Sequence, residues 1–344
     1  MNTTYIKSLK TPIAVLGLGK SGLSALCLLK EFGYTNEQLI TYDESSKSAQ
    51  YKNSEQILTV EPKTIVVSPG FPLATPWLQK LINSGSHLTS EITLAASLMT
   101  TEKIIGVTGS VGKSTVVSLL GAGLKAFDST AFVGGNIGTP PCDYALNKVK
   151  NGIKANWIIL ELSSYQLENC SQLNLDYSII TYLSPNHLER YASLDQYYQT
   201  KLHITSITKE FCLFSKTSKD CEKYAKHSKS KFKLINAENF SHQELLPQVY
   251  LLGLHNRDNF SLAAEMASSC GWPINSFLEM AHYRGLPHRL EFVAKLGGIT
   301  YVNDSKATAM DSVLVAVKGC IENLSNESKL FLLLGGKDKN LPWG

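Results

Sequence analysis

The stretch GVTGSVGKST, from Gly106 to Thr115, holds glycines, a lysine and hydroxyls in an order that can bind nucleotide phosphates. The N–H groups of such a turn, the positive end of the next helix and the lysine all attract phosphate. The usual spacing places a glycine at the position of Val107, so the sequence predicts a variant loop. The alternative is a glycine-rich turn that only permits close packing. The predicted nucleotide contacts are Gly109, Ser110, Val111, Gly112, Lys113, Ser114 and Thr115.

A second glycine motif, GLGKSG from Gly17 to Gly22, follows a short apolar run, and Asp43 ends the next predicted strand. This pattern is typical of dinucleotide-binding domains, in which the acid binds a ribose, and alone it indicates an NAD-dependent oxidoreductase. The same helix N-terminus can instead hold the diphosphate of a UDP-sugar, and a tight turn without a nucleotide is also possible. The second phosphate loop favours the UDP-sugar, because an NAD enzyme would not need a site for ATP.

A carboxylate and a histidine each follow a predicted buried strand. The apolar run Trp157–Leu160 ends at Glu161, and the run Ile179–Leu183 precedes SPNHLERY, which contains His187. The carboxyl ends of parallel strands face the ligand crevice, so Glu161 is positioned to hold Mg²⁺ for the nucleotide. The alternatives are a capping or ion-paired acid and a structural histidine.

Apolar runs of strand length alternate with amphipathic segments of helix length, as parallel α/β layers require. No repeat of fixed period is visible. The predicted strands are Ile13–Gly17, Gln38–Asp43, Thr64–Ser68, Lys103–Thr108, Trp157–Leu162, Tyr177–Leu183, Phe211–Phe214, Tyr250–Gly253, Ile299–Asn303 and Leu330–Leu334.

Length and composition limit the class of protein. With 344 residues, the chain exceeds one ordinary domain of about 150 residues and predicts two or three. No apolar run approaches the ~18 residues that span a bilayer, so we expect a cytoplasmic protein. Seven cysteines without a C-x-x-C pair indicate neither a disulfide framework nor a zinc site. The net charge is +4, and the lysine-rich segment Lys216–Lys233 lacks arginine, which favours a solvated surface over a nucleic-acid site.

Seven motifs follow one another along the chain: GLGKSG, TGSVGKST, GGNIGTP, ELSSYQLE, SPNHLERY, GLPHRLE and NDSKAT. Taken together, they resemble the Mur ligase family, and most closely its D-glutamate-adding branch. The family uses a shortened loop, G-x-x-G-K-[ST]-[ST], which accounts for Val107. The resemblance implies an α/β fold of three domains: a Rossmann-like UDP-sugar domain (1–99), a P-loop ATP domain (100–285) and an incomplete Rossmann-like amino-acid domain (286–344).

The resemblance implies an ATP-dependent ligase of cytoplasmic peptidoglycan precursor synthesis, with Mg²⁺. It would add D-glutamate to UDP-N-acetylmuramoyl-L-alanine through an acyl phosphate, as a monomer that binds neither nucleic acid nor membrane. Three alternatives stay open. They are a sibling ligase, the NAD oxidoreductase, and a fragment that binds UDP-sugar and ATP without turnover.

The resemblance also carries residue roles, each matched to one of the quoted motifs. Catalytic roles fall on Lys113, His187, Lys201 and Arg289, and magnesium roles on Ser114, Glu161, His187 and Lys201, the last as a carbamate. Beyond the phosphate loop, the ATP contacts would be Asn256, Asn259, Arg289 and Asp304. Substrate contacts would be Gly19, Lys20, Ser21, Asp43, Ser68, Pro69, Gly70, Asn136, Lys306, Thr308 and Lys339.

Three departures from the family pattern stand out. Asn186 precedes the histidine where many members have aspartate, and Arg257 and Asp258 separate two asparagines where small or apolar residues are common. The family's third domain continues well beyond the length of this chain. We therefore expect an unpaired sheet edge and the lowest stability in the segment from Leu286 onward.

Overall fold

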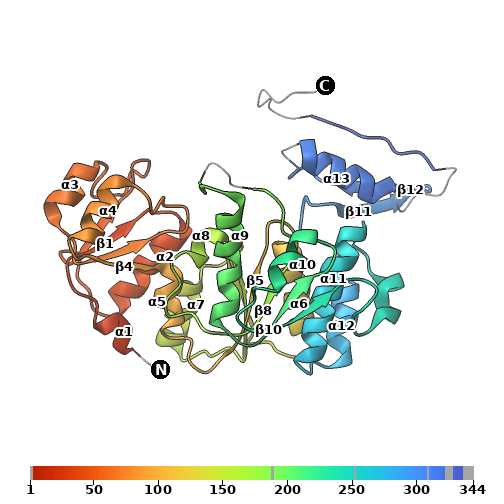
Figure 1. Cartoon of the computed structure of the whole chain (residues 1–344), viewed down its shortest axis with the longest axis horizontal. Coiled ribbons are helices and arrows are strands. Elements are labelled where there is room, and N and C mark those ends of the chain that lie inside the picture. The colour runs from red at the N-terminus through yellow and green to blue at the C-terminus, as the bar shows by residue number, and fades with distance from the viewer. Residues whose placement is uncertain (1–2, 187–189, 252, 308–309, 322–327, 336–344) are drawn as a thin grey trace.

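The structure is a computed structural model, and it describes residues 3–186, 190–251, 253–307, 310–321 and 328–335. Its strands form a four-stranded sheet, a six-stranded sheet and a two-stranded hairpin, in that order along the chain. Figure 1 shows the first sheet in red and orange at one end, the second in the middle and the hairpin in blue beyond it.

The first sheet has the order β2-β1-β3-β4 and is parallel throughout. Strand β1 is buried on both faces, because its alternate residues pack against different helices. Ile13 and Val15 share a cluster with Leu28 of α2, whereas Ala14 and Leu16 pack with the cluster that contains Leu78 of α4. The bounds are α1 Thr4–Lys7, β1 Ile13–Leu16, α2 Lys20–Glu31, β2 Leu39–Tyr42, α3 Ser54–Val60, β3 Thr64–Val67, α4 Pro76–Asn83 and β4 His87–Ser90.

The second sheet has the order β10-β9-β8-β5-β7-β6, again all parallel, with the phosphate-loop strand β5 near its centre. Helices α6, α11 and α12 pack together on one face. Helices α7 to α10 follow the strands in turn (Figure 1). The bounds are α5 Glu91–Ala96, β5 Lys103–Thr108, α6 Lys113–Lys125, β6 Phe132–Gly135, α7 Pro141–Asn151, β7 Trp157–Glu161, α8 Ser164–Leu167, β8 Leu175–Ile180, α9 Leu194–Leu202, η1 His203–Ile207, β9 Thr208–Ser215, α10 Lys219–Ala225, β10 Lys231–Ile235, η2 Gln243–Gln248, α11 Leu254–Ser269 and α12 Ile274–Ala281.

The two parallel sheets are joined by a packed interface of helices α2, α5 and α7. One cluster of buried apolar residues runs from β1 and α2 through α5 to β7, so both sheets share part of their core. Polar contacts reinforce it: Ser24 Oγ donates to Asp143 at 2.6 Å, and the Cys142 N–H donates to Glu91 Oε1 at 2.6 Å. Lys150 and Glu31 add an exposed ion pair at 3.2 Å.

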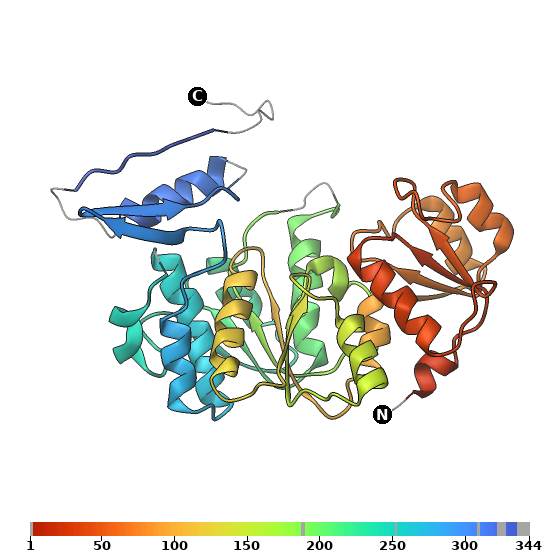
Figure 2. The ribbon, with the colours of Figure 1, turned by 180° about the vertical axis from the view of Figure 1, so that it is seen from behind.

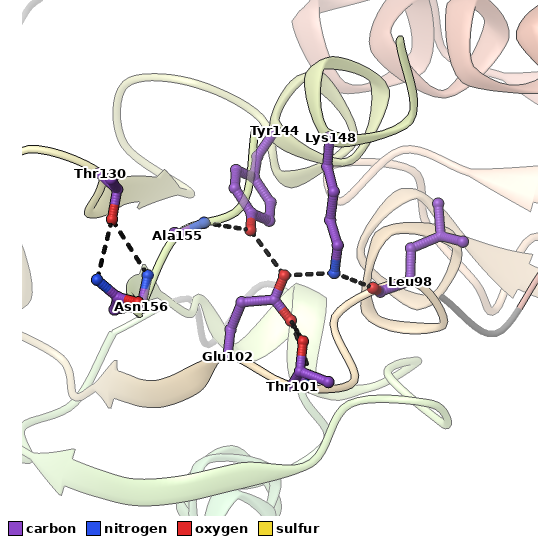
Figure 3. A network of polar contacts seen from close by, with 8 residues as sticks. All are labelled: Leu98, Thr101, Glu102, Thr130, Tyr144, Lys148, Ala155 and Asn156. Atoms are coloured by element: carbon purple, nitrogen blue, oxygen red, sulfur yellow. Dashed lines mark hydrogen bonds and ion pairs between the residues drawn. The ribbon is translucent and has the colours of Figure 1, made fainter. Parts of the chain in front are cut away.

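A buried ion pair lies near this interface, where α7 meets the segment before β5 (Figure 3). The Glu102 carboxylate accepts from Lys148 Nζ and from the Tyr144 hydroxyl, and Lys148 also donates to the Leu98 carbonyl at 2.7 Å. Burial favours the neutral acid, but the bonds from Lys148 and Tyr144 outweigh it and lower the pKa of Glu102. The pair is therefore fully partnered, which is the condition for an ion pair to be tolerated in a core.

The last helices and strands assigned in the described residues are the antiparallel strands β11 Glu291–Leu296 and β12 Ile299–Asn303, followed by helix α13 Met310–Ile321. Figures 1 and 2 both show them beyond α11, on the side away from the first sheet. Within the described part of the chain, no helix is long and apolar enough to cross a membrane.

Two predicted strands are wrong. The described residues of Tyr250–Gly253 form no strand, because the Tyr250 N–H bonds to the Ala281 carbonyl and Gly253 caps α11 with a φ of 90°. The segment Leu330–Leu334 has no strand assignment among the described residues, and Leu333 is 95% exposed. In both places an apolar run indicated burial, but no strand among the described residues supplies hydrogen bonds to the backbone.

Candidate active site

The phosphate loop lies between β5 and α6, at the carboxyl end of the second sheet. Gly109 has a φ of 147° and Gly112 a φ of 90°, which side chains rarely adopt. A Cβ on Gly109 would lie 2.0 Å from Thr181 Oγ1, and one on Gly112 would lie 2.5 Å from Asn259 Oδ1. Glycine is therefore required at both positions, and the shortened loop has the strand-turn-helix setting of a phosphate site.

Two lysine amines converge on this loop. Lys113 Nζ donates to the Gly109 carbonyl at 2.9 Å, and Lys201 Nζ donates to the same oxygen at 2.8 Å. Lys201 is only 2% exposed, and burial, followed by the charge of Lys113, lowers its pKa to about 6. Burial also lowers the pKa of Lys113. The loop thus gathers two basic groups where phosphate oxygens would lie.

Glu161 ends β7 beside the loop, and each of its carboxylate oxygens accepts a hydrogen bond. Ser114 Oγ donates to Glu161 Oε2 at 2.7 Å, and Asn136 Nδ2 donates to Oε1 at 2.8 Å. A hydroxyl and a carboxylate in contact are oxygen ligands of the kind that Mg²⁺ prefers, so the pair fits this ion. His187 lies outside the described residues. Among the residues that are described, no group of three or more His, Cys, Asp or Glu side chains could hold a metal ion.

The two predicted nucleotide asparagines lie in the first turns of α11. Asn259 Nδ2 donates to Asn256 Oδ1 at 3.1 Å, and Asn259 faces Gly112 closely. The inserted Asp258 points elsewhere, because its Oδ1 accepts the Ala237 N–H at 3.2 Å. The structure thus brings Asn259 to the phosphate loop, with Asn256 bonded to it.

The hairpin supplies charged groups to the same region. The positive charge of Arg289, just before β11, acts to lower the pKa of Lys113 and that of Asp304. Asp304 Oδ1 accepts the Leu290 N–H at 3.0 Å, and burial raises its pKa. The Lys306 N–H bonds to the His288 carbonyl, which ties the NDSKAT segment to the start of the hairpin. Thr308 and Lys339 lie outside the described residues.

A separate open cleft of about 720 Å³ lies at the carboxyl end of the first sheet. Its lining includes every predicted UDP-site residue, namely Gly19, Lys20, Ser21, Asp43, Ser68, Pro69 and Gly70, together with Asn136. The last of these comes from the second sheet, so residues of both sheets meet in one cleft.

Asp43 serves mainly to hold the loops of this cleft. Its Oδ2 accepts the Leu18 N–H at 2.7 Å, and its Oδ1 accepts the N–H and hydroxyl of Ser45 and the N–H of Ser46. The Leu18 bond, followed by those from Ser45, lowers the pKa of Asp43 to about 2. An acid so engaged has little capacity left for the ribose hydroxyls that a dinucleotide would present.

Sequence reasoning missed the aromatic wall of this cleft. Tyr42, Phe71 and Trp77 all line it, with ring centroids 5.2 to 6.2 Å apart. The signal was available in the position of Tyr42 beside Asp43 and in the aromatic residues after the Ser68–Gly70 turn. Such rings commonly pack in ligand clefts because they offer large apolar area at little entropic cost.

Comparison with known proteins decides the family. The Mur ligase middle domain family matches residues 107–243. The UDP-N-acetylmuramoylalanine–D-glutamate ligase of Koribacter versatilis is 30% identical over 96% of this chain and 78% of its own length. The chain belongs to the Mur ligase family. The ligase of the same name from Acidobacterium capsulatum is 32% identical over 95% of this chain and 77% of its own length.

Solved structures show the Mur ligase fold. The UDP-N-acetylmuramate-alanine ligase MurC of Thermotoga maritima has a TM-score of 0.52 and 17% identity, over 91% of this chain and 78% of its own. The MurF ligase of the same organism, solved with ADP, has a TM-score of 0.54 and 16% identity, over 82% of this chain and 71% of its own. The predicted family and the predicted α/β architecture are thus confirmed, and this chain is shorter than these relatives.

Proposed function

We propose that this chain is an ATP-dependent ligase that joins D-glutamate to UDP-N-acetylmuramoyl-L-alanine in cytoplasmic peptidoglycan precursor synthesis. Relatives of that name match about 95% of the chain. One observation in the structure carries the proposal: Asn136 lines the open cleft and also bonds to Glu161 beside the phosphate loop. A UDP-sugar in the cleft and ATP at the loop would therefore meet at this residue.

In the first step, a carboxylate oxygen of the UDP-sugar attacks the γ-phosphorus of ATP, the bond to the β-phosphate oxygen breaks, and ADP leaves. Lys113 and Arg289 would offset the negative charge that the phosphates bring together. Asn256 and Asn259 would contact ATP from α11, and Asp304 would accept from its ribose. When bound by Ser114 and Glu161, with His187 at a second site, Mg²⁺ supplies further positive charge to the phosphates.

In the second step, the amine of D-glutamate attacks the acyl-phosphate carbon and loses a proton, while the carbon–oxygen bond breaks and inorganic phosphate leaves. Lys306, Thr308 and Lys339 are the proposed contacts to the amino acid or phosphate. Gly19, Lys20, Ser21 and the Ser68–Gly70 turn would hold the UDP group. These roles assign residues 1–99 to the UDP-sugar, 100–285 to ATP and 286–344 to the amino acid.

We further propose that Lys201 carries a carbamate, formed when its neutral amine attacks CO₂ and releases a proton. Buried Lys201 and partly buried Lys113 donate to one carbonyl oxygen, and the charge of Lys113 disfavours a second ammonium group beside it. A carbamate would replace this repulsion with attraction and add an anionic oxygen ligand beside the phosphate loop.

The test measures phosphate release from ATP with UDP-N-acetylmuramoyl-L-alanine and Mg²⁺, with and without D-glutamate. We expect release that depends on both substrates, and its loss in Lys113→Met. The matched control is Lys125→Met, which removes an exposed lysine from the last turn of α6. Binding of both ligands without release would make the chain a binding fragment. Binding of nicotinamide dinucleotide in place of UDP-sugar would refute the proposal.

A further inference from the structure

Arg190 forms a bridge between the second sheet and the cleft of the first. Its Nη2 donates to Glu168 Oε2 at 2.8 Å and to the Phe71 carbonyl at 3.4 Å. Its guanidinium carbon lies 3.9 Å from the centroid of the Tyr165 ring, so the group is stacked as well as paired. Tyr191 supports this arrangement, because its hydroxyl donates to the other oxygen of Glu168 at 2.6 Å.

The carbonyl that Arg190 binds belongs to the turn that forms one wall of the cleft. The Phe71 N–H closes this turn on the Ser68 carbonyl at 3.0 Å, and Ser68 Oγ donates to the Gly17 carbonyl at 2.7 Å. Both the turn and the glycine loop line the cleft, and the Phe71 ring packs against Tyr42 there. A shift of the turn would therefore move the glycine loop and the aromatic wall together.

A second observation places Arg190 at the seam between the two sheets. A cavity of about 10 Å³, the size of one water molecule, is lined by Arg190, Ser68, Phe71, Glu91 and Asn169. Within the described residues, Glu91 Oε2 and Asn169 Nδ2 have no hydrogen-bond partner. The boundary between the two sheets therefore contains polar groups and a small cavity as well as apolar packing. Arg190 lines this cavity and donates directly to the Phe71 carbonyl of the turn.

From these contacts we propose that Arg190 is a positioning residue that holds the Ser68–Phe71 turn in the shape that binds the UDP-sugar. The inference rests on the proposed function, because it assumes that the UDP-sugar binds in this cleft. Arginine suits the role, since its planar group can pair with Glu168, stack on Tyr165 and still reach a carbonyl. Lysine offers a point charge and no stacking plane.

The test compares the dissociation constants of UDP-N-acetylmuramoyl-L-alanine and ADP by calorimetry in Arg190→Met and Arg190→Lys. Methionine keeps an unbranched apolar side chain and removes the guanidinium group, and with it both the charged donor and the stacking on Tyr165. We expect Arg190→Met to weaken UDP-sugar binding on the order of tenfold, the effect of one hydrogen bond from a charged group, and to leave ADP binding unchanged. Arg190→Lys should lie between it and the unmodified protein.

The matched control is Lys150→Gln, which removes the exposed ion pair to Glu31 from the same interface, away from the cleft. It should change neither constant. Equal weakening of UDP-sugar and ADP in Arg190→Met would mean a general structural role and would overturn the inference, as would unchanged UDP-sugar binding. If the unmodified chain binds ADP but no UDP-sugar, the proposed function fails first and the inference fails with it.

Discussion

Replacing Glu91 by glutamine should stabilise the protein at pH 8 and have little effect at pH 5. Glu91 is fully buried where the first two sheets meet, and among the described residues only its Oε1 has a hydrogen-bond partner, the Cys142 N–H. Burial raises the pKa of Glu91 from 4.5 to about 7, and the neighbouring charge of Asp143 adds to the effect. Glutamine resembles the protonated acid in shape and hydrogen bonding, so it removes the titration.

The sign follows from proton binding. An unfolded chain releases this proton near pH 4.5, whereas the folded chain keeps it until about pH 7, so stability falls as pH rises between these values. At about 1.4 kcal/mol per pH unit, the loss amounts to about 3 kcal/mol by pH 8. Below the lower value both states are protonated, and the variant and the parent should be equally stable.

The assay is urea unfolding of both proteins at pH 5, 6, 7 and 8. Glu91→Gln should gain on the parent over this range by about 2.5 kcal/mol, since a smaller part of the loss has already occurred at pH 5. Glu31→Gln is the control, because that acid lies at the same interface but is partly exposed, and its curve should run parallel to the parent's. A constant difference between Glu91→Gln and the parent from pH 5 to 8 would refute the reasoning.

Three further outcomes are expected. Gly112→Ala should weaken ADP binding at least tenfold, because its Cβ would be strained at positive φ and would collide with Asn259. Gly152→Ala is the control, since Gly152 also has a positive φ but lies in open space, and it should leave ADP binding unchanged. Equal ADP affinities of the two variants would contradict this. Lys148→Met should destabilise the protein by about 3–5 kcal/mol by leaving Glu102 buried and unpaired, and an unchanged melting temperature would count against it. If Lys201 is carbamylated, removing CO₂ and bicarbonate should slow phosphate release, and adding bicarbonate should restore it; an indifferent rate would exclude the carbamate.

The sequence predicted both glycine loops because their residue types are set by steric limits. No side chain fits at Gly109 or Gly112, so the pattern must appear in any chain that builds this loop. Glu161 could be predicted for a different local reason: it directly follows a run of four buried residues, which marks the end of a strand. At these positions the residue type follows from the local backbone, and the structure places Glu161 beside the phosphate loop through its bond to Ser114.

Several strands were missed because their sequences are not apolar. Strand β4 reads HLTS, β6 reads FVGG with two glycines, and β10 reads KFKLI with exposed lysines. β4 and β10 pair with longer or more buried neighbours that were predicted, β3 and β9. Their assignment depends on tertiary hydrogen bonds, which no local pattern records.

The contact of Arg190 with the cleft could not be predicted for a related reason. Arg190 and Phe71 are 119 residues apart, and their meeting depends on how two sheets pack. The motif SPNHLERY directed attention to its histidine, which lies outside the described residues, and the arginine three positions later carried no signal of its own.

Asn136 has a thermodynamic consequence. It lines the open cleft, and its main-chain N–H and its side chain both donate to Glu161, so a ligand that moves Asn136 also changes the surroundings of the phosphate loop. Such linkage is reciprocal: the factor by which ATP alters the affinity for the UDP-sugar must equal the factor by which the UDP-sugar alters the affinity for ATP. Asn136→Ala should bring both factors close to one, so that each ligand binds as if the other were absent.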